Sequence, residues 1–167
     1  MKSNKNLVLL GMMGSGKSTV GKLIAKKLNL DFIDIDCQIE KKADMTISEI
    51  FKQKSEVYFR SLEEKISIKA LKSNNSVISL GGGGFINEKI RKNILSNHFS
   101  FWLDWDESIL LKRIKNSKKR PLVFKLTDKK IKEIIKERTK IYSKAQFKIN
   151  CNKLTKSEIQ KKIIENL

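Results

Sequence analysis

The run from Gly11 to Ser18 contains the residue types that bind phosphate. It reads GMMGSGKS, with an apolar strand candidate before it and an apolar-periodic helix candidate after it. Its three glycines allow positive φ and close backbone approach, so successive N–H groups can point at an anion. Lys17 supplies a compact charge for the β- and γ-phosphates, and Ser18 supplies a hydroxyl for Mg²⁺. The order of strand, loop and helix predicts a nucleotide-binding P-loop, with an ordinary glycine-rich turn as the alternative.

Two aspartates, Asp34 and Asp36, end the next apolar segment, FIDID at 32–36. On an extended chain they would point the same way, and at the carboxyl end of a parallel strand they would face the ligand crevice. The alternative is a helix N-cap followed by a solvated charge. Asp104 ends a later strand candidate and is a second choice for an acid near Mg²⁺. We rank it lower because we expect its strand to lie farther from the P-loop strand.

Four consecutive glycines, 81–84, follow the apolar segment 76–80. Such a run costs chain entropy, which indicates that another group approaches the backbone there. A flexible linker is the alternative. We favour a turn that contacts a ligand, because both flanks are apolar.

Arginine is scarce in this chain, with five arginines against 31 lysines. An arginine in such a chain indicates that a planar, bidentate fork is needed. The five are Arg60, Arg91, Arg113, Arg120 and Arg138. Arg60 and Glu63 lie three apart on a helix candidate, a spacing that is often only a surface ion pair. Arg138 and Tyr142 lie four apart and share a helix face.

Strand-length and helix-length apolar segments alternate along the chain. The strand candidates are 6–10, 30–36, 76–80, 99–103 and 147–151. This alternation predicts an α/β fold with a doubly wound parallel sheet, in a single domain over 1–167. Residues 37–75 should form two or more helices that build a wall of a second pocket. The basic segment at about 115–127, with Arg120 and Pro121, suits a lid over phosphates; a solvated loop is the alternative.

The formal net charge of +18 could mark a nucleic-acid binder. Lysines are spread along the chain, however, and no basic motif interleaved with aromatic residues occurs, so we expect anionic small substrates and no required nucleic acid. No apolar run approaches the length of a membrane span, and the short apolar start leads straight into the glycine loop, so we expect no membrane association. Cys37 and Cys151 lack metal-like spacing and indicate free thiols. We expect a cytoplasmic monomer.

With these residues in place, the chain resembles the shikimate kinase family over essentially its full length. The matching motifs are GMMGSGKST at 11–19, FIDID at 32–36, YFRSLEE at 58–64, SLGGG at 79–83, RPL at 120–122 and ERTKIY at 137–142. The first motif is shared by many nucleotide-binding proteins, whereas the ordered set is far more specific. One departure is Gly84, where the family more often has a small residue with a side chain.

The resemblance implies a three-layer α/β/α P-loop kinase with a five-stranded parallel sheet in the order 2-3-1-4-5. It also implies transfer of the γ-phosphoryl group of ATP to the 3-hydroxyl of shikimate, with Mg²⁺ as cofactor, in aromatic amino-acid biosynthesis. The implied catalytic residues are Lys17, Asp36 and Arg120. The implied ATP-binding residues are Gly14, Ser15, Gly16, Lys17, Ser18, Thr19, Arg113, which would lie against the adenine, and Arg120. The implied substrate-binding residues are Asp36, Arg60, Gly82, Gly83 and Arg138. Ser18, and Asp34 through water, would hold the metal.

Other functions remain open at this point. A gluconate or nucleoside monophosphate kinase would share the fold, and only the FRxxE and GGG motifs argue against it. A GTPase switch would need DxxG and NKxD motifs, and neither is present, because Asn152-Lys153 continues with Leu-Thr. A basic, non-catalytic P-loop protein that binds nucleotide or nucleic acid is the alternative outside the enzymes.

Overall fold

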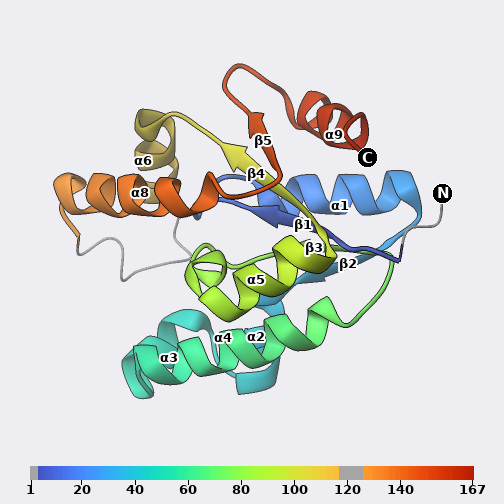
Figure 1. The fold of residues 1–167 in the computed structure, drawn as a ribbon. Coiled ribbons are helices and arrows are strands. Elements are labelled where there is room, and N and C mark those ends of the chain that lie inside the picture. The colour runs from blue at the N-terminus through green and yellow to red at the C-terminus, as the bar shows by residue number, and fades with distance from the viewer. Residues whose placement is uncertain (1–3, 117–125) are drawn as a thin grey trace.

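The computed structural model describes residues 4–116 and 126–167. Its centre is a five-stranded sheet in the order β2-β3-β1-β4-β5, in which all neighbouring strands are parallel (Figure 1). The strands are β1 Leu7–Leu10, β2 Asp31–Asp34, β3 Ser76–Ser79, β4 Phe99–Asp104 and β5 Phe147–Asn150. The predicted fold class and strand order are confirmed.

β4 lies directly beside the P-loop strand, so our expectation about its distance was wrong. Val8 of β1 pairs with Ile78 on one side and with Ser100 of β4 on the other. β2 is the strand that lies farther away, because β3 separates it from β1. Distance across the sheet therefore gives no reason to prefer Asp34 over Asp104.

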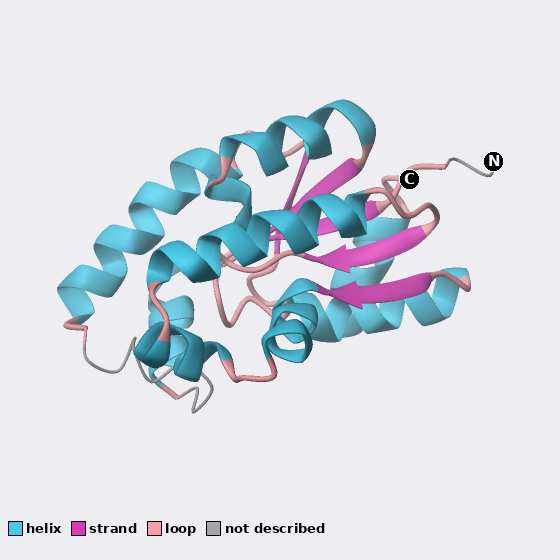
Figure 2. Ribbon diagram, turned by 90° about the horizontal axis from the view of Figure 1, so that it is seen from below, coloured by secondary structure: helices cyan, strands magenta, loops and turns pink. Residues whose placement is uncertain are grey.

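Helices cover both faces of the sheet (Figures 1 and 2). Their bounds are α1 Lys17–Leu28, α2 Ile35–Ala43, α3 Ile47–Gln53, α4 Glu56–Leu71, η1 Gly84–Ile86, α5 Glu88–Asn97, α6 Glu107–Lys115, α8 Asp128–Tyr142 and α9 Lys156–Ile164. Among residues 4–116 and 126–167, no helix is both long and apolar enough to cross a bilayer.

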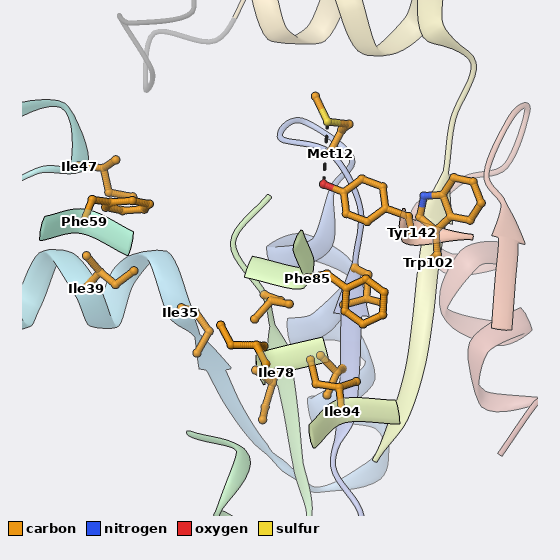
Figure 3. Close-up of a cluster of buried hydrophobic side chains, with 14 of the residues drawn as sticks. Met12, Ile35, Ile39, Ile47, Phe59, Ile78, Phe85, Ile94, Trp102 and Tyr142 are labelled. Carbon is orange, nitrogen blue, oxygen red and sulfur yellow. Dashed lines mark hydrogen bonds between the residues drawn. The ribbon is translucent and has the colours of Figure 1, made fainter. Parts of the chain in front are cut away.

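Alternating residues of β1 supply two separate cores. Leu7 and Leu9 pack with α1 and α9 on one face, while Val8 and Leu10 pack with α2 to α6 and α8 on the other. Figure 3 shows part of the second cluster. Successive strand side chains point to opposite faces, so a strand covered on both faces reads as an unbroken apolar run. That is why LVLL has no polar alternation.

The N-caps explain where most helices begin. Thr46 and Thr155 each form a capping box with the glutamate three residues later. Asp106 occupies the N-cap position of α6, but its side chain makes no capping bond. Instead its carboxylate accepts a hydrogen bond from Asn152 at 2.8 Å. Asp106 thus ties the start of α6 to the loop after β5.

The carboxyl ends of the strands gather at one edge of the sheet. In Figure 2 the strand arrowheads point away from the labelled N-terminus. The P-loop follows β1, Asp34 ends β2, and the glycine run follows β3. Parallel pairing therefore brings together three segments that are far apart in sequence.

At the opposite edge, a buried histidine makes stability depend on pH. The N–H of Asn6 donates to Nδ1 of His98 at 3.3 Å, which requires that nitrogen to be unprotonated. Burial lowers the pKa of His98, and Lys5 lowers it further. The unfolded chain therefore takes up this proton at a higher pH than the folded chain. The free energy of unfolding should therefore decrease as the pH is lowered from ~6.5. The decrease should reach up to about 1 kcal/mol at pH 5.5.

Urea unfolding at pH 7.5 and 5.5 measures this loss. His98→Gln removes the titrating group and should show a smaller difference between the two pH values. An equal difference in the variant would mean that other groups cause the loss.

Candidate active site

The glycine loop forms a cradle around Lys17. Gly11, Gly14 and Gly16 have φ of 139°, 78° and 90°, the left-handed region that glycine alone adopts readily. Lys17 is only 8% exposed as a residue. Its ammonium donates to the carbonyl oxygens of Gly11 at 2.8 Å and Met12 at 2.9 Å. α1 begins at Lys17, so its N-terminus faces the same space. The loop has the geometry of an anion site.

Trp105 and Arg113 donate hydrogen bonds to carbonyl oxygens of this loop. Ser15 is buried, and its carbonyl accepts a hydrogen bond from the indole N–H of Trp105 at 2.9 Å. The guanidinium of Arg113 lies 3.7 Å from the centre of the Trp105 ring and donates to the carbonyl of Gly14 at 3.4 Å. Arg113 therefore lies at the P-loop. Trp105 had no role in the sequence-based interpretation.

Ser18 and Asp34 meet at the open side of the loop. The hydroxyl of Ser18 donates to the Asp34 carboxylate at 2.5 Å and lies 3.4 Å from the hydroxyl of Ser79. Asp34 also caps α2, because it accepts from the N–H of Cys37. Asp104, by contrast, is ion-paired with Lys148 at 3.0 Å. This ion pair, and not the distance across the sheet, is the reason to prefer Asp34 over Asp104 as the acid near Mg²⁺.

These oxygen atoms suit Mg²⁺. The residues that the structure describes contain no cluster of three or more His, Cys, Asp or Glu side chains arranged to hold a metal ion. Mg²⁺ usually keeps several waters and takes few protein ligands, so a hydroxyl and one carboxylate fit it better than a full protein cage would.

Asp36 is positioned by a helix, contrary to the extended arrangement expected for FIDID. β2 ends at Asp34 and α2 begins at Ile35, which puts Asp36 in the first helical turn. Asp36 faces Gly81: a Cβ built at Gly81 would lie 2.8 Å from Oδ1 of Asp36 and 2.7 Å from Oε1 of Glu63. Two carboxylates thus converge on the glycine run.

Glu63 is buried, which the sequence-based interpretation did not predict. The apolar residues of α4 suggest a buried face made of Tyr58, Phe59, Leu62, Ile66 and Leu71, yet Tyr58 is 44% exposed. The buried residues of α4 are Phe59, Glu63, Ser67 and Leu71. Their spacing of four was visible in the sequence, but its two central members are polar. The Glu63 side chain is only 3% exposed and bonds Arg60 at 2.7 Å, so this is not a surface ion pair.

Charge and burial compete at this pair. Burial raises the pKa of the Glu63 carboxyl above its usual value, Arg60 lowers it in part, and the charge of Asp36 raises it again. For Arg60, burial alone would lower the pKa, but the carboxylates of Glu63 and Glu56 outweigh burial and raise it. The ion pair therefore fixes the orientation of the Arg60 guanidinium.

The glycine run is needed for close approach, as predicted. None of Gly81 to Gly84 has a positive φ among the described residues. A Cβ at Gly83 would lie 2.2 Å from Nη1 of Arg60. Gly84 packs on Leu80, whose side chain would be 2.8 Å from an added Cβ. Arg91, to which the resemblance gave no role, donates to the carbonyls after the run, those of Phe85 and Ile86.

Arg138 and Tyr142 reach the same glycines from α8. Nη1 of Arg138 donates to the carbonyl of Gly82 at 3.2 Å. The hydroxyl of Tyr142 donates to the same carbonyl and lies 3.9 Å from the sulfur of Met12, the contact drawn in Figure 3. The prediction that these two residues share a helix face is confirmed, because both side chains donate to the carbonyl of Gly82.

Two adjoining cavities are lined by most of the predicted residues, but not by Ser15 or Arg113. One, of about 370 Å³, lies at the P-loop and is lined by Lys17, Ser18, Thr19, Asp34 and Asp36, among others. The second, of about 180 Å³, is lined by Arg60, Glu63, Gly82, Gly83 and Arg138 together with apolar side chains. Met13, Ile47 and Ile114 line both. Arg120 and most of the predicted lid fall at 117–125, outside the described residues.

Gly81 offers a test of the junction between these cavities. Gly81→Ala should raise the KM for the acceptor at least about tenfold, because the methyl group pushes apart the carboxylates of Asp36 and Glu63. The KM for nucleotide should change less than twofold. Steady-state kinetics with each substrate varied in turn measures both. An acceptor KM that stays at the value of the unmodified protein would show that this approach is not needed.

A phosphate-binding loop at the carboxyl end of a parallel sheet, beside a pocket of paired arginines and carboxylates, defines a small P-loop kinase. The family model described as shikimate kinase matches residues 13–167. The chain belongs to the shikimate kinase family.

Individual relatives agree with this assignment. The chain is 43% identical to the shikimate kinase of Sulfurihydrogenibium sp. strain YO3AOP1 over 163 residues, which are 98% of each chain. It is similar to the crystal structure of shikimate kinase from Aquifex aeolicus, with a TM-score of 0.86 and 39% identity over 96% of this chain and 94% of that one. Shikimate kinase from Acinetobacter baumannii, solved in complex with shikimate, matches with a TM-score of 0.92 and 28% identity over 99% and 93%.

Proposed function

We propose that this chain transfers the γ-phosphoryl group of ATP to the 3-hydroxyl of shikimate, giving shikimate 3-phosphate for aromatic amino-acid biosynthesis. The observation that carries the proposal is the junction at Gly81, where Asp36 of the P-loop cavity and Glu63 of the arginine-lined cavity meet. A small acid with adjacent hydroxyls needs a cationic fork at one end and a carboxylate acceptor at the other. These neighbouring cavities offer both.

The nucleotide occupies the P-loop cavity in this proposal. The backbone of residues 14–19 surrounds the phosphates, and Lys17 turns from the loop carbonyls to the β- and γ-phosphates. Arg113 lies against the adenine, and Arg120 reaches the transferring phosphate from the lid. The hydroxyl of Ser18 and, through water, Asp34 would hold Mg²⁺, which when bound neutralises charge on the phosphates. Positioning and charge neutralisation are the main sources of catalysis in phosphoryl transfer.

The acceptor occupies the second cavity. Arg60 and Arg138 bind its carboxylate, and the backbone of Gly82 and Gly83 lies along its ring. Glu63 keeps the Arg60 guanidinium in place through the 2.7 Å ion pair. Asp36 accepts hydrogen bonds from the hydroxyls and assists removal of the proton from the attacking one. The geometry supports this assignment because Asp36 lines the cavity that also contains Lys17.

The chain works as one domain over 1–167 in this scheme, with the helices in 37–75 forming the acceptor wall and about 115–127 closing as a lid. Closure would keep water from competing as the phosphoryl acceptor. We propose a monomer acting in the cytoplasm. Cys37 and Cys151 are free thiols, which suits a reducing compartment.

A coupled spectrophotometric assay of ADP release tests the function. With ATP and Mg²⁺ present, shikimate should support turnover, whereas gluconate and nucleoside monophosphates should give less than about 1% of that kcat/KM, a difference set by unpaired polar groups in the wrong complex. Turnover confined to gluconate or to a nucleoside monophosphate would contradict the proposal. So would tight nucleic-acid binding with a steep salt dependence and no turnover of any acceptor.

A further inference from the structure

Trp105 lies between the P-loop and the two apolar clusters. It follows β4 directly, is half-buried, and packs against the apolar clusters on both faces of the sheet. Its indole N–H donates to the carbonyl of Ser15 at 2.9 Å. β4 is the neighbour of β1, so the residue after β4 emerges beside the loop that follows β1. The sheet order therefore brings this tryptophan to the phosphate site.

The bond to Ser15 constrains the next N–H group. A trans peptide is planar, so the Ser15 carbonyl and the Gly16 N–H point in opposite directions. Ser15 is 1% exposed, whereas Gly16 lines the P-loop cavity. A carbonyl held towards Trp105 thus directs the Gly16 N–H to the cavity side.

The neighbouring peptides are held by backbone hydrogen bonds, from the Ser15 N–H to the Met12 carbonyl at 3.2 Å and from the Val20 N–H to the Gly16 carbonyl at 2.9 Å. Gly16 has φ of 90°, and a Cβ built on it would meet no atom within 4 Å. Glycines on either side of Ser15 give the loop wide conformational freedom. A single strong donor aimed at the Ser15 carbonyl therefore limits rotation of the peptide.

A face of the indole ring carries Arg113. Its guanidinium lies 3.7 Å from the ring centre, a distance at which a cation is attracted to the aromatic face. A planar guanidinium on an aromatic ring loses less freedom when it then binds a ligand. One side chain thus organises both the loop backbone and an arginine assigned to the nucleotide.

We propose that Trp105 is a positioning residue for the nucleotide, which keeps the Gly16 N–H aimed at the phosphates and presents Arg113 beside the base. This inference rests on the proposed ATP site. It assigns Trp105 no contact with a reacting atom. A packing role alone would predict that any large apolar side chain could replace the indole.

Trp105→Phe separates the hydrogen bond from the ring, because phenylalanine keeps an aromatic face for Arg113 and loses the N–H. Calorimetric titration with ATP–Mg²⁺ and with inorganic tripolyphosphate–Mg²⁺ should show affinity reduced about three- to tenfold for both, the usual effect of one lost hydrogen bond. The KM for ATP should rise by the same factor, while kcat and the KM for shikimate stay within about twofold, because this contact serves ground state and transition state alike.

Trp102→Phe is the matched control, since it makes the same substitution three residues earlier, within β4. Trp102 is 3% exposed and packs near Tyr142, with ring centres 6.2 Å apart. Its replacement should leave the affinity for tripolyphosphate within about twofold, because no hydrogen bond of the P-loop is lost. Equal weakening in both variants would overturn the proposal, and so would unchanged tripolyphosphate affinity in Trp105→Phe.

The same control gives a second measurement that does not need Trp105→Phe to fold. The sequence has two tryptophans, so Trp105 is the sole indole in Trp102→Phe. Its fluorescence should change when tripolyphosphate–Mg²⁺ binds, and an unchanged spectrum at saturation would overturn the proposal. If the unmodified protein binds no ATP at all, the proposed function fails whatever Trp105 does.

Discussion

Lys17→Met is expected to lower kcat by on the order of 1,000-fold, because it removes the one P-loop charge that reaches the β- and γ-phosphates. In the structure, the ammonium bonds the carbonyl oxygens of Gly11 and Met12. That position keeps the charge inside the loop before nucleotide arrives, and from there the ammonium would turn to the phosphates. Steady-state turnover with saturating ATP and shikimate measures the loss.

The fold should survive this substitution. Methionine has a chain of similar length, and the sheet and both apolar clusters do not depend on the ammonium. Far-ultraviolet circular dichroism and the midpoint of thermal unfolding provide the control. A collapsed spectrum in Lys17→Met would mean that the lysine is structural and that its loss of activity says nothing about phosphate binding.

Asp36→Asn is the second large effect, with kcat/KM for shikimate expected to fall by about 100- to 1,000-fold. The amide keeps the shape but cannot accept a proton from the attacking hydroxyl. It also removes a negative charge next to Glu63, whose carboxyl pKa the charge of Asp36 raises. Calorimetric titration with ATP–Mg²⁺ should give an affinity within about threefold of the unmodified protein, because that difference is below 1 kcal/mol.

Arg138→Lys gives an independent view of the same pocket. Lysine keeps the charge but loses the planar fork that reaches Gly82 and the acceptor carboxylate. We expect most turnover to be lost and ATP binding to be kept. If Asp36→Asn and Arg138→Lys both weakened ATP binding as strongly as they weakened turnover, the acceptor pocket would be wrongly assigned.

Much of the fold was predictable because its signals are local. The strand order came from the family resemblance, and the strands themselves from short apolar runs. The capping boxes at Thr46 and Thr155 were visible because a threonine and a glutamate three residues apart satisfy each other's backbone donors. The placement of Asp36 was not predictable in this way, because the chain turns from strand to helix within FIDID.

The acceptor pocket shows where a pattern of apolar residues fails. The spacing of Phe59, Glu63, Ser67 and Leu71 is helical, but a buried ion pair looks like a solvated one until the groups that cover it are known. Arg60 and the glycine run supply that environment, and they lie on different elements. A polar residue in a core is therefore visible only after the elements are packed.

The amino-acid sequence by itself determined the phosphate loop, the alternation of strands and helices, and the few arginines available to bind an acid. These depend on contacts between residues close in sequence, or on side-chain chemistry that does not change with the fold. Only the tertiary structure decided that Glu63 is buried against Arg60, that Asp36 and Glu63 share Gly81, and that Trp105 restrains Ser15. Asp36, Glu63 and Gly81, like Trp105 and Ser15, lie on segments that parallel strand pairing brings together, and the burial of Glu63 depends on the same packing. The local sequence carries no record of which distant group will arrive.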